Sequence, residues 1–345
     1  MAEDKRPLAL TLGDPAGIGP DITLAAWAAQ AREPVPPFVL VGDAAVLALR
    51  GKTLGRSIPV RVVSEAREAQ AVFAEALPVL EAAAPPPVIA GRPDPATAHA
   101  ILESIDRAVA LVQAGEARAI VTNPIAKSLL YGAGFAYPGH TEYLASLAAC
   151  GGEPPRPVMM LAAGGFRVVP ATVHMPLKDV PASLSTELVL DVIEITAKDL
   201  RRLFGVARPR LAVSGLNPHA GEDGGLGREE IDIIAPAIEA ARARGIDATG
   251  PHPADTLFHA GARKDYDAAI CMYHDQALVP FKTLAFEEGV NVTLGLPFVR
   301  TSPDHGTAFA IAGTGRANPR SLIEALRLAD AMTRASLAAA PGRSA

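Results

Sequence analysis

Short apolar runs alternate with longer helical runs rich in Ala and Leu along nearly the whole chain. Strand-like runs precede helical ones repeatedly, and alternation of this kind predicts a mainly parallel sheet flanked by helices. The predicted strands include residues 8–12, 38–41, 60–63 and 119–122, and the predicted helices include 21–30, 98–114 and 321–337. The Pro-rich run 83–87 is predicted to be a stiff surface loop.

The length of the chain favours two domains. Its 345 residues are long for one domain, and either half could bury a core of its own. Hydrophobic residues make up 49% and charged residues 20%, which excludes a disordered chain. The net charge of −5 gives no electrostatic reason to expect nucleic acid or an anionic membrane as a partner.

The cysteines and the amino terminus bear on the compartment. Cys150 and Cys271 are the two cysteines and lack CxxC spacing, which suits a reducing environment. The first seven residues are charged and do not resemble a signal peptide, and no apolar run approaches the roughly 18 residues needed to span a bilayer. A cytoplasmic location is the expectation.

Three histidines stand where an apolar run gives way to a polar turn. They are His174, His219 and His274. In a parallel sheet the carboxyl ends of the strands share one edge, and ligands bind there. Three imidazoles at that edge could hold a divalent metal and leave a position open for substrate. The alternative for each is a hydrogen-bonded turn residue.

A Gly-rich turn, Gly13-Asp-Pro-Ala-Gly-Ile-Gly-Pro20, follows the first strand and opens a helix. Free amides at a helix start can receive an anion. The run matches neither G-x-G-x-x-G nor a Walker loop. A tight strand-to-helix turn therefore explains it at least as well as a binding loop.

A second loop, residues 305–319, is too rich in small residues to be a good helix. It resembles the nucleotide-binding loop of the decarboxylating dehydrogenases of isocitrate and isopropylmalate, which hold their cofactor without a Rossmann fingerprint. The resemblance implies NAD or NADP as cofactor. Its implied contacts are His305, Gly306, Thr307 and Asn318.

Several long, uncommon runs occur together and in order. They are the Gly-rich turn, Val121-Thr-Asn-Pro-Ile-Ala-Lys127, Gly139-His-Thr-Glu-Tyr-Leu144, Gly215-Leu-Asn-Pro-His-Ala-Gly-Glu222, Pro253-Ala-Asp-Thr-Leu-Phe258, Met272-Tyr-His-Asp-Gln276 and Gly289-Val-Asn-Val-Thr-Leu-Gly-Leu-Pro-Phe-Val-Arg-Thr301. Together they resemble the 4-hydroxythreonine-4-phosphate dehydrogenases of pyridoxal phosphate synthesis, from the first strand to the last helix.

The resemblance implies a particular architecture. The fold would be α/β, with two α/β/α domains and an interdomain cleft, as in isocitrate and isopropylmalate dehydrogenases. Residues 1–130 together with 300–345 would form a discontinuous first domain. Residues 131–299 would form the second, which carries the metal ligands and the dimer contacts. The enzyme would be a homodimer whose active site is completed at the subunit interface.

Site residues follow from the same resemblance. The metal ligands fall on His174, His219 and His274, the three that the strand-end pattern selects, and the ion would be Zn2+, Mg2+ or Co2+. The implied substrate-binding residues are His140, Thr141, Lys282, Asn291 and Arg300. Arg300 ends an apolar run, so it is predicted to lie at a strand end. Lys282, Asp255 and Asp275 are alternatives for the catalytic base, and Asp275 is also a candidate to orient a neighbouring imidazole.

The implied reaction is NAD(P)-dependent oxidation of 4-phosphooxy-L-threonine. The product, 2-amino-3-oxo-4-(phosphooxy)butanoate, decarboxylates to 3-amino-2-oxopropyl phosphate. A related dehydrogenase of 4-phospho-erythronate or threonate 4-phosphate remains an alternative, because no motif assigns recognition of the substrate amino group. A metal-dependent hydrolase and a non-catalytic binding protein are further alternatives, although the chain lacks the HExxH signature.

Overall fold

The computed structural model describes residues 4–132, 134–137, 139–149 and 151–339. The chain divides into two compact units. Unit 1 consists of Met1–Pro157 and Leu296–Arg334, and unit 2 consists of Val158–Gly295 and Ala335–Ala345. Strands and helices alternate in both units, so the predicted α/β class is confirmed.

Unit 1 contains a parallel sheet with helices on its faces. Its strands lie in the order β3 (Val60–Val63), β4 (Leu77–Glu81), β2 (Phe38–Gly42), β1 (Leu8–Thr11), β5 (Ile120–Val121) and β12 (Arg300–Pro303). Its helices are α1 (Gly19–Ala29), α2 (Ala44–Thr53), α3 (Ala69–Val72), α4 (Ala98–Gln113), α5 (Lys127–Gly132), α6 (His140–Ala148) and most of α12 (Arg320–Ala339). The strand order reverses between β1 and β5. Ligands of open α/β sheets bind outside the carboxyl ends at such a reversal.

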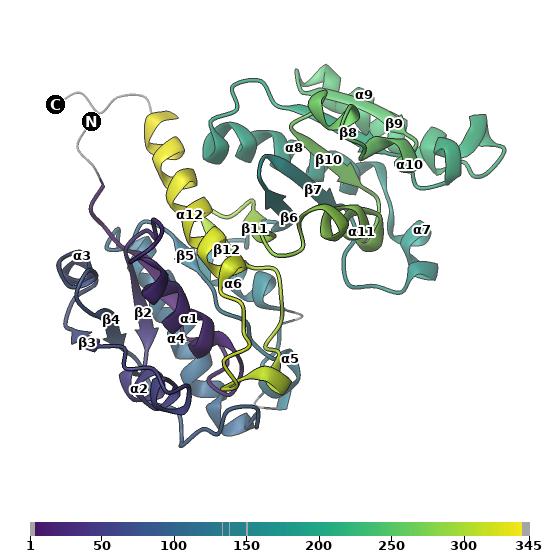
Figure 1. The fold of residues 1–345 in the computed structure, drawn as a ribbon. Helices are drawn as coiled ribbons and strands as arrows, with labels where there is room; N and C mark the ends of the chain where they lie inside the picture. The colour runs from purple at the N-terminus through teal and green to yellow at the C-terminus, as the bar shows by residue number, and fades with distance from the viewer. Residues whose placement is uncertain (1–3, 133, 138, 150, 340–345) are drawn as a thin grey trace. The chain divides into compact units, whose positions relative to one another are not determined.

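Helix α4 supplies one side of the unit 1 core. Its apolar residues Ile101, Ile105 and Val109 recur at helical spacing and pack in one buried cluster with residues of β1 and β2. The one polar residue on this stripe is satisfied, since the Ser104 hydroxyl accepts from Leu12 N at 2.9 Å and donates to Val41 O at 2.6 Å. Helix α1 lies in front of the strands in Figure 1 and α4 behind them. Both faces of the sheet are therefore covered.

Unit 2 contains a mixed sheet. Its strands lie in the order β11 (Val290–Leu294), β6 (Val158–Ala163), β7 (Phe166–Pro170), β10 (Ala268–Cys271), β8 (Arg210–Ser214) and β9 (Asp247–His252). Its helices are α7 (Val180–Ser183), α8 (Thr186–Phe204), α9 (Ala235–Ala243), α10 (Ala254–Leu257) and α11 (His274–Ala285). Strand β6 is antiparallel to both β11 and β7. The β6–β7 turn uses Gly164 and Gly165 at φ 52° and 90°, as two-residue hairpins require.

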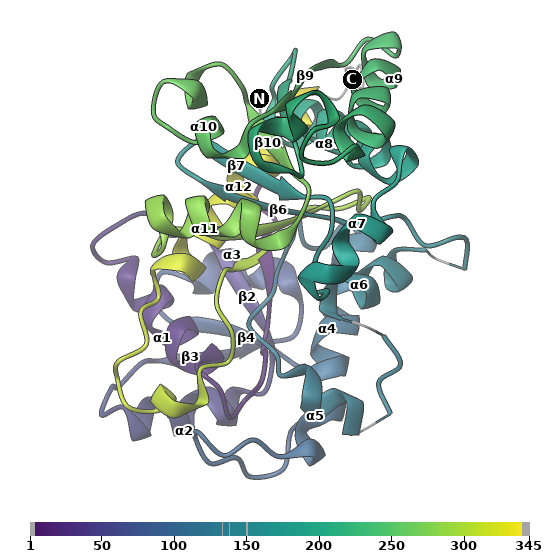
Figure 2. The ribbon, with the colours of Figure 1, turned by 90° about the vertical axis from the view of Figure 1, so that its right-hand side faces the viewer.

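Three neighbouring parallel strands of unit 2 position the histidines. Strand β10 pairs in parallel with β7 on one side and β8 on the other. Their carboxyl ends therefore share one edge, and His174, His219 and His274 follow these ends by a few residues. Helix α11, seen in front of the strands in Figure 2, begins at His274 and packs on β7 and β10. The strand-end placement predicted for the three histidines holds in the structure.

The boundary between the units differs from the expected one. The first boundary lies at Pro157 rather than after residue 130, because Leu144 and Ala145 of α6 are buried in the same core as α4. The return to unit 1 comes at Leu296 rather than at residue 300, since Leu296 and Phe298 also pack in that core. The described residues of 131–157 and residues 296–299 thus belong to unit 1, whereas residues 335–339, expected in the first domain, belong to unit 2.

The longest described helices are α8, with 19 residues, and α12, with 20. Both carry charged residues throughout their length, including Glu194 and Lys198 of α8. No helix in the described ranges is long and apolar enough to cross a membrane.

Replacing Phe281 by Ala is expected to destabilise unit 2 by about 3–5 kcal/mol, the usual loss for a large buried aromatic side chain. Phe281 is fully buried on α11, and its ring stacks on that of Phe166 with centroids 5.6 Å apart. Urea unfolding measures the loss. Phe286→Ala is the matched control, because Phe286 is 73% exposed and its loss should cost under about 1 kcal/mol. Equal losses for the two variants would contradict this assignment of the core.

Candidate functional site

His174 and His274 face one cavity at the carboxyl edge of unit 2. Their ring centroids lie 5.4 Å apart with planes tilted by 45°. The cavity measures about 230 Å³, and Thr172, Tyr273 and Asp275 also line it. Two imidazoles bound to one tetrahedral zinc at about 2.0–2.1 Å would place their centroids about 5 Å apart. The observed spacing therefore fits two ligands of a single metal ion.

Asp275 orients one of these rings. Its carboxylate oxygen Oδ1 lies 2.8 Å from Nδ1 of His274. A carboxylate partner on one ring nitrogen fixes the tautomer and leaves the other nitrogen to bind a metal. His274 is the first residue of α11, so the start of the helix fixes its backbone. This contact favours the orienting role considered for Asp275.

His219 does not join this pair in the structure. It lies in an exposed turn, η4 (Pro218–Gly224), with Nδ1 2.5 Å from Oε1 of Glu222. The hydrogen bond to Glu222 raises the pKa of His219. Among the described residues, no group of three or more His, Cys, Asp or Glu side chains is arranged to hold a metal ion. The structure thus brings two of the three predicted ligands together.

The turn that carries His219 has an uncommon backbone. Residues 219–223 all have positive φ, from 43° to 83°, and His174 has φ 47°. Left-handed backbone costs about 1–2 kcal/mol for a residue with a side chain, and such strain concentrates at functional sites. Glu230 holds the turn, since its buried carboxylate accepts from Leu216 N and Asn217 N, both at 2.7 Å.

The other predicted residues of unit 2 are more dispersed. Asp255 is exposed on α10, close enough to His219 to contribute to its raised pKa. Lys282 follows His274 by eight residues on α11, or about 12 Å along the helix axis. Its Nζ lies 5.5 Å from the centre of the Phe286 ring. Asn291 is partly buried in β11. These three are not among the residues that line the cavity of the histidine pair.

Unit 1 contains a second constellation, at the start of α6. His140 and Thr141 are the first residues of that helix, and its Gly139 N-cap supplies no side chain to cap the amides. Helix starts with unused amides favour anions. Nε2 of His140 is buried and has no hydrogen-bond partner among the described residues. The position suits an acceptor oxygen of a bound ligand.

Arg300 lies close to His140. It is 4% exposed, and its Nη2 donates to the Thr122 hydroxyl at 2.8 Å. Burial lowers the pKa of Arg300 to about 10, so the guanidinium remains charged at neutral pH. Arg300 lies at a strand end, as predicted, and it is the first residue of β12. The apolar run before it is divided, because β11 ends at Leu294 and residues 295–299 form a connection.

Lys127 is a residue of this site that the sequence alone did not select. Burial first, and then the positive charges of Arg300 and Lys127, lower the pKa of His140 well below its usual value. Lys127 Nζ and Glu142 Oε2 lie 2.9 Å and 2.7 Å from where a side chain at Gly139 would begin, so both side chains reach the N-cap of α6. The available signal was that Lys127 ends the uncommon motif of residues 121–127, which follows β5. We call Lys127, His140 and Arg300 the α6 cluster.

The predicted cofactor loop, residues 305–319, follows β12. His305 is partly buried, and its Nδ1 lies 3.1 Å from Gly306 O. Thr307 O accepts from Ile18 N at 2.9 Å. Asn318 is exposed, and its Oδ1 accepts from Arg320 N at 3.0 Å at the start of α12. The loop is thus fastened at both ends and has exposed residues between them.

The Gly-rich turn proves to be a structural connection. Its amides are used within the protein: Ala16 N donates to Asp14 Oδ1 at 2.9 Å and Gly17 N donates to Asp14 O at 3.0 Å. A side chain at Gly13 would approach Asn123 Cβ to 2.6 Å. Burial raises the pKa of Asp14, which is fully enclosed. The alternative of a tight strand-to-helix turn is the one that the contacts support.

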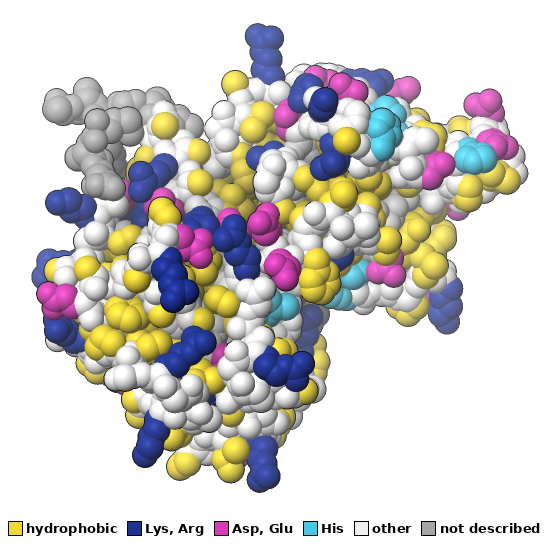
Figure 3. All heavy atoms as spheres, in the orientation of Figure 1, with side chains coloured by type: hydrophobic (Ala, Val, Ile, Leu, Met, Phe, Trp, Pro, Cys, Tyr) yellow, Lys and Arg dark blue, Asp and Glu magenta, His cyan; other side chains and the backbone are white. Residues whose placement is uncertain are grey.

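On the face drawn in Figure 3, Lys and Arg side chains are interspersed with Asp and Glu. This agrees with the modest net charge of −5.

Comparison with known proteins shows similarity over nearly the whole chain. Residues 34–329 match the family model described as pyridoxal phosphate biosynthetic protein PdxA. A 4-hydroxythreonine-4-phosphate dehydrogenase of Bradyrhizobium diazoefficiens is 58% identical over 337 residues, covering 96% of this chain and 98% of the relative. One of Methylorubrum populi is 60% identical over 332 residues, with 95% of each covered. The crystal structure of the Klebsiella pneumoniae enzyme of that name superposes with a TM-score of 0.83 at 38% identity, covering 95% and 99% of the two chains.

The pH dependence of stability is expected to reflect His140. Its pKa is lowered in the folded protein, so between the ordinary value of 6.5 and the folded value the unfolded chain binds the extra proton. Stability should therefore fall as the pH drops below about 6.5. His140→Gln should lose less stability than wild type between pH 7.5 and 5.5, measured by urea unfolding without phosphate. His99→Gln, an exposed change on α4, is the control and should keep the wild-type pH dependence. The same slope in His140→Gln would contradict the buried environment assigned to His140.

Proposed function

The chain belongs to the 4-hydroxythreonine-4-phosphate dehydrogenase (PdxA) family of pyridoxal phosphate biosynthesis, and on that premise we propose how its residues divide the reaction. Unit 1 binds the phosphate and the dinucleotide, and unit 2 supplies the metal ligands. The substrate is 4-phosphooxy-L-threonine. The hydride acceptor is NAD+ or NADP+, as a dehydrogenase of this kind requires. We also propose a cytoplasmic location, consistent with the buried free thiol of Cys271.

The α6 cluster is the observation that carries this proposal. It places the buried guanidinium of Arg300 and the primary amine of Lys127 near the imidazole of His140. The backbone amides at the start of α6 lie at the same place. Such groups recognise a phosphate, Arg300 through paired N–H donors and Lys127 as a point charge. Because His140 is neutral, it can donate one N–H to a phosphate oxygen without adding charge to the cluster. Thr141, beside it, offers a hydroxyl and a backbone amide.

The metal ligands proposed are His174, His274 and His219. The spacing of the first two rings and the Asp275 contact support the pair. His219 lies on an exposed turn, and we propose that it completes the set in the homodimer that the family resemblance implies. Imidazole ligands suit Zn2+ or Co2+, and Mg2+ is the alternative with more oxygen ligands. When bound, the cation supplies electrostatic stabilisation of negative charge on the substrate oxygen.

The proposed reaction needs a proton acceptor, residues that hold the two ends of the substrate, and residues that bind the dinucleotide. A residue must take the proton of the substrate hydroxyl while its carbon gives a hydride to the dinucleotide, and Lys282, Asp255 and Asp275 are the candidates. Since Asp275 already orients His274, Lys282 and Asp255 remain the stronger choices. Decarboxylation of the resulting β-keto acid then needs its phosphate and carboxylate ends held, for which Arg300 and Asn291 are proposed. The dinucleotide is proposed to bind along His305, Gly306, Thr307 and Asn318.

A turnover assay tests the proposal directly. The protein is supplied with 4-phosphooxy-L-threonine, NAD+ or NADP+, and Zn2+, Mg2+ or Co2+ in turn. We expect absorbance of the reduced cofactor together with CO2 in equal amounts. Faster turnover of 4-phospho-erythronate would assign the chain to the related dehydrogenases instead. Release of inorganic phosphate without cofactor reduction would favour a hydrolase.

Metal affinity should depend on the histidine pair. His174→Ala and His274→Ala are each expected to weaken Zn2+ or Co2+ binding at least tenfold, because each removes one imidazole ligand. Equilibrium dialysis with metal analysis measures this without any turnover. His259→Ala, an exposed histidine of unit 2, should bind as wild type does. His219→Ala should match the first two variants, and unchanged affinity there would remove His219 from the ligand set.

A further inference from the structure

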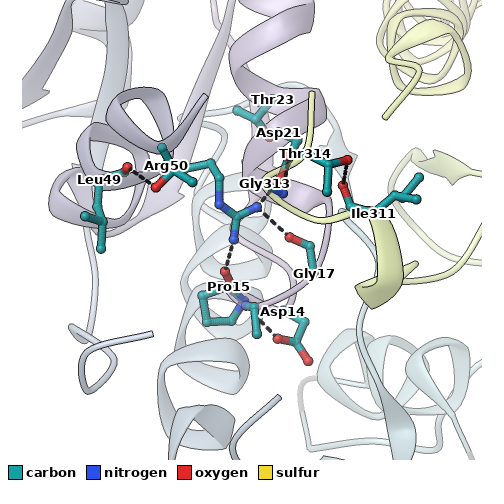
Figure 4. Close-up of polar contacts among 12 residues, drawn as sticks. Asp14, Pro15, Gly17, Asp21, Thr23, Leu49, Arg50, Ile311, Gly313 and Thr314 are labelled. Atoms are coloured by element: carbon teal, nitrogen blue, oxygen red, sulfur yellow. Dashed lines mark hydrogen bonds and ion pairs between the residues drawn. The ribbon is translucent and has the colours of Figure 1, made fainter. Parts of the chain in front are cut away.

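Arg50 of α2 is a buried cation that the proposed reaction does not use. It is 5% exposed and reaches into the Gly-rich turn, where Nη1 donates to Gly17 O at 2.8 Å and Nη2 donates to Pro15 O at 2.9 Å. Nη1 also forms an ion pair with Asp21 of α1, which is 3% exposed. Figure 4 shows the guanidinium between these partners.

The second carboxylate oxygen of Asp21 reaches the cofactor loop. Asp21 Oδ1 accepts from Gly313 N at 2.8 Å, across 292 positions of sequence. Gly313 has φ 73°, and a side chain there would come within 2.8 Å of Ala90 Cβ. The loop therefore approaches so closely that one buried carboxylate sets the position of its backbone. Arg50 in turn fixes that carboxylate.

The same residues border a cavity in unit 1. It measures about 670 Å³, and Leu49, Arg50, Ile89, Ala312 and Gly313 are among the residues that line it. Gly313, which lines this cavity, belongs to the cofactor loop and donates its backbone N–H to Asp21. A shift of Gly313 would change the shape of this cavity as well as the course of the loop.

Stability alone does not account for a buried ion pair at this place. Removing two charges from water costs several kcal/mol, and apolar residues of similar volume often stabilise a core as well or better. What an apolar pair lacks is an acceptor for Gly313 N. The ion pair thus supplies the loop with a hydrogen-bond acceptor, which hydrophobic side chains could not supply.

We propose that Asp21 is a positioning residue that holds Gly313 and thereby sets the affinity of residues 305–319 for the dinucleotide, and that Arg50 neutralises the buried carboxylate of Asp21. The inference rests on the proposed function, which assigns the dinucleotide to that loop. Asp21 acts through its bond to Gly313 N, and Arg50 acts through Asp21. Neither residue takes part in hydride transfer.

Two double variants separate this role from a purely structural one. D21N/R50M removes both charges and keeps a side-chain oxygen for Gly313 N. D21A/R50M removes both charges and that oxygen. Binding of NADH and NADPH is followed by fluorescence titration of the full-length protein, and Tm is measured alongside. We expect D21N/R50M to bind within threefold of wild type and D21A/R50M to bind at least tenfold more weakly, with the KM for the phosphorylated substrate within twofold.

R118M is the matched control for loss of a buried ion pair. Arg118 is 5% exposed at its side chain and pairs with Asp330, also in unit 1. R118M should lower Tm and leave dinucleotide affinity unchanged. Equal affinities for D21N/R50M and D21A/R50M would overturn the positioning role, as would a tenfold loss in R118M.

His305→Ala distinguishes this failure from failure of the proposed function. If wild type binds NADH or NADPH and His305→Ala weakens binding, the loop is the cofactor site and the two double variants decide the inference. If His305→Ala binds as tightly as wild type, or wild type binds neither dinucleotide, the cofactor assignment and the inference fall together.

Discussion

Parallel hydrogen bonding between strands is the constraint on which the rest of this protein depends. A parallel ladder cannot be closed by a tight turn, so each pair needs a crossover, and all carboxyl ends reach the same edge. In unit 2 this brings together the segments after β7, β8 and β10, although β7 and β10 lie about a hundred residues apart in the chain. In unit 1 it places the ends of β1 and β5 side by side at the reversal of strand order. The proposed ligand sites follow from these two edges.

Whether the backbone amides of a loop have hydrogen-bond acceptors within the protein decides whether they can bind an anion. The Gly-rich turn after β1 has the composition of an anion loop, yet Asp14 and Thr307 accept the amide hydrogens of Ala16, Gly17 and Ile18. At α6 the opposite holds, because Gly139 supplies no cap and His140 presents a buried ring nitrogen. The lack of a side-chain cap, rather than glycine content, distinguishes the start of α6 from the Gly-rich turn.

Electrostatics distinguishes the two imidazole environments. His140 lies near Arg300 and Lys127, which together with burial keep its ring neutral. His219 is exposed beside a carboxylate, which favours its protonated form. The contact of its Nδ1 with Glu222 accompanies the placement of His219 away from the pair formed by His174 and His274.

The sequence by itself determined the α/β class, the alternation of strands and helices and the family, because periodicity and long motifs are local properties of the chain. It also selected His140 and Arg300 through the family motifs. It did not select Lys127 for the anion site, nor the bond from Asp21 to Gly313. Those depend on which segments pack together, and no local pattern records a contact across 292 positions. The boundary between the units was likewise decided by the packing of α6 and of Leu296 into the unit 1 core, where burial of apolar surface outweighs position in the chain.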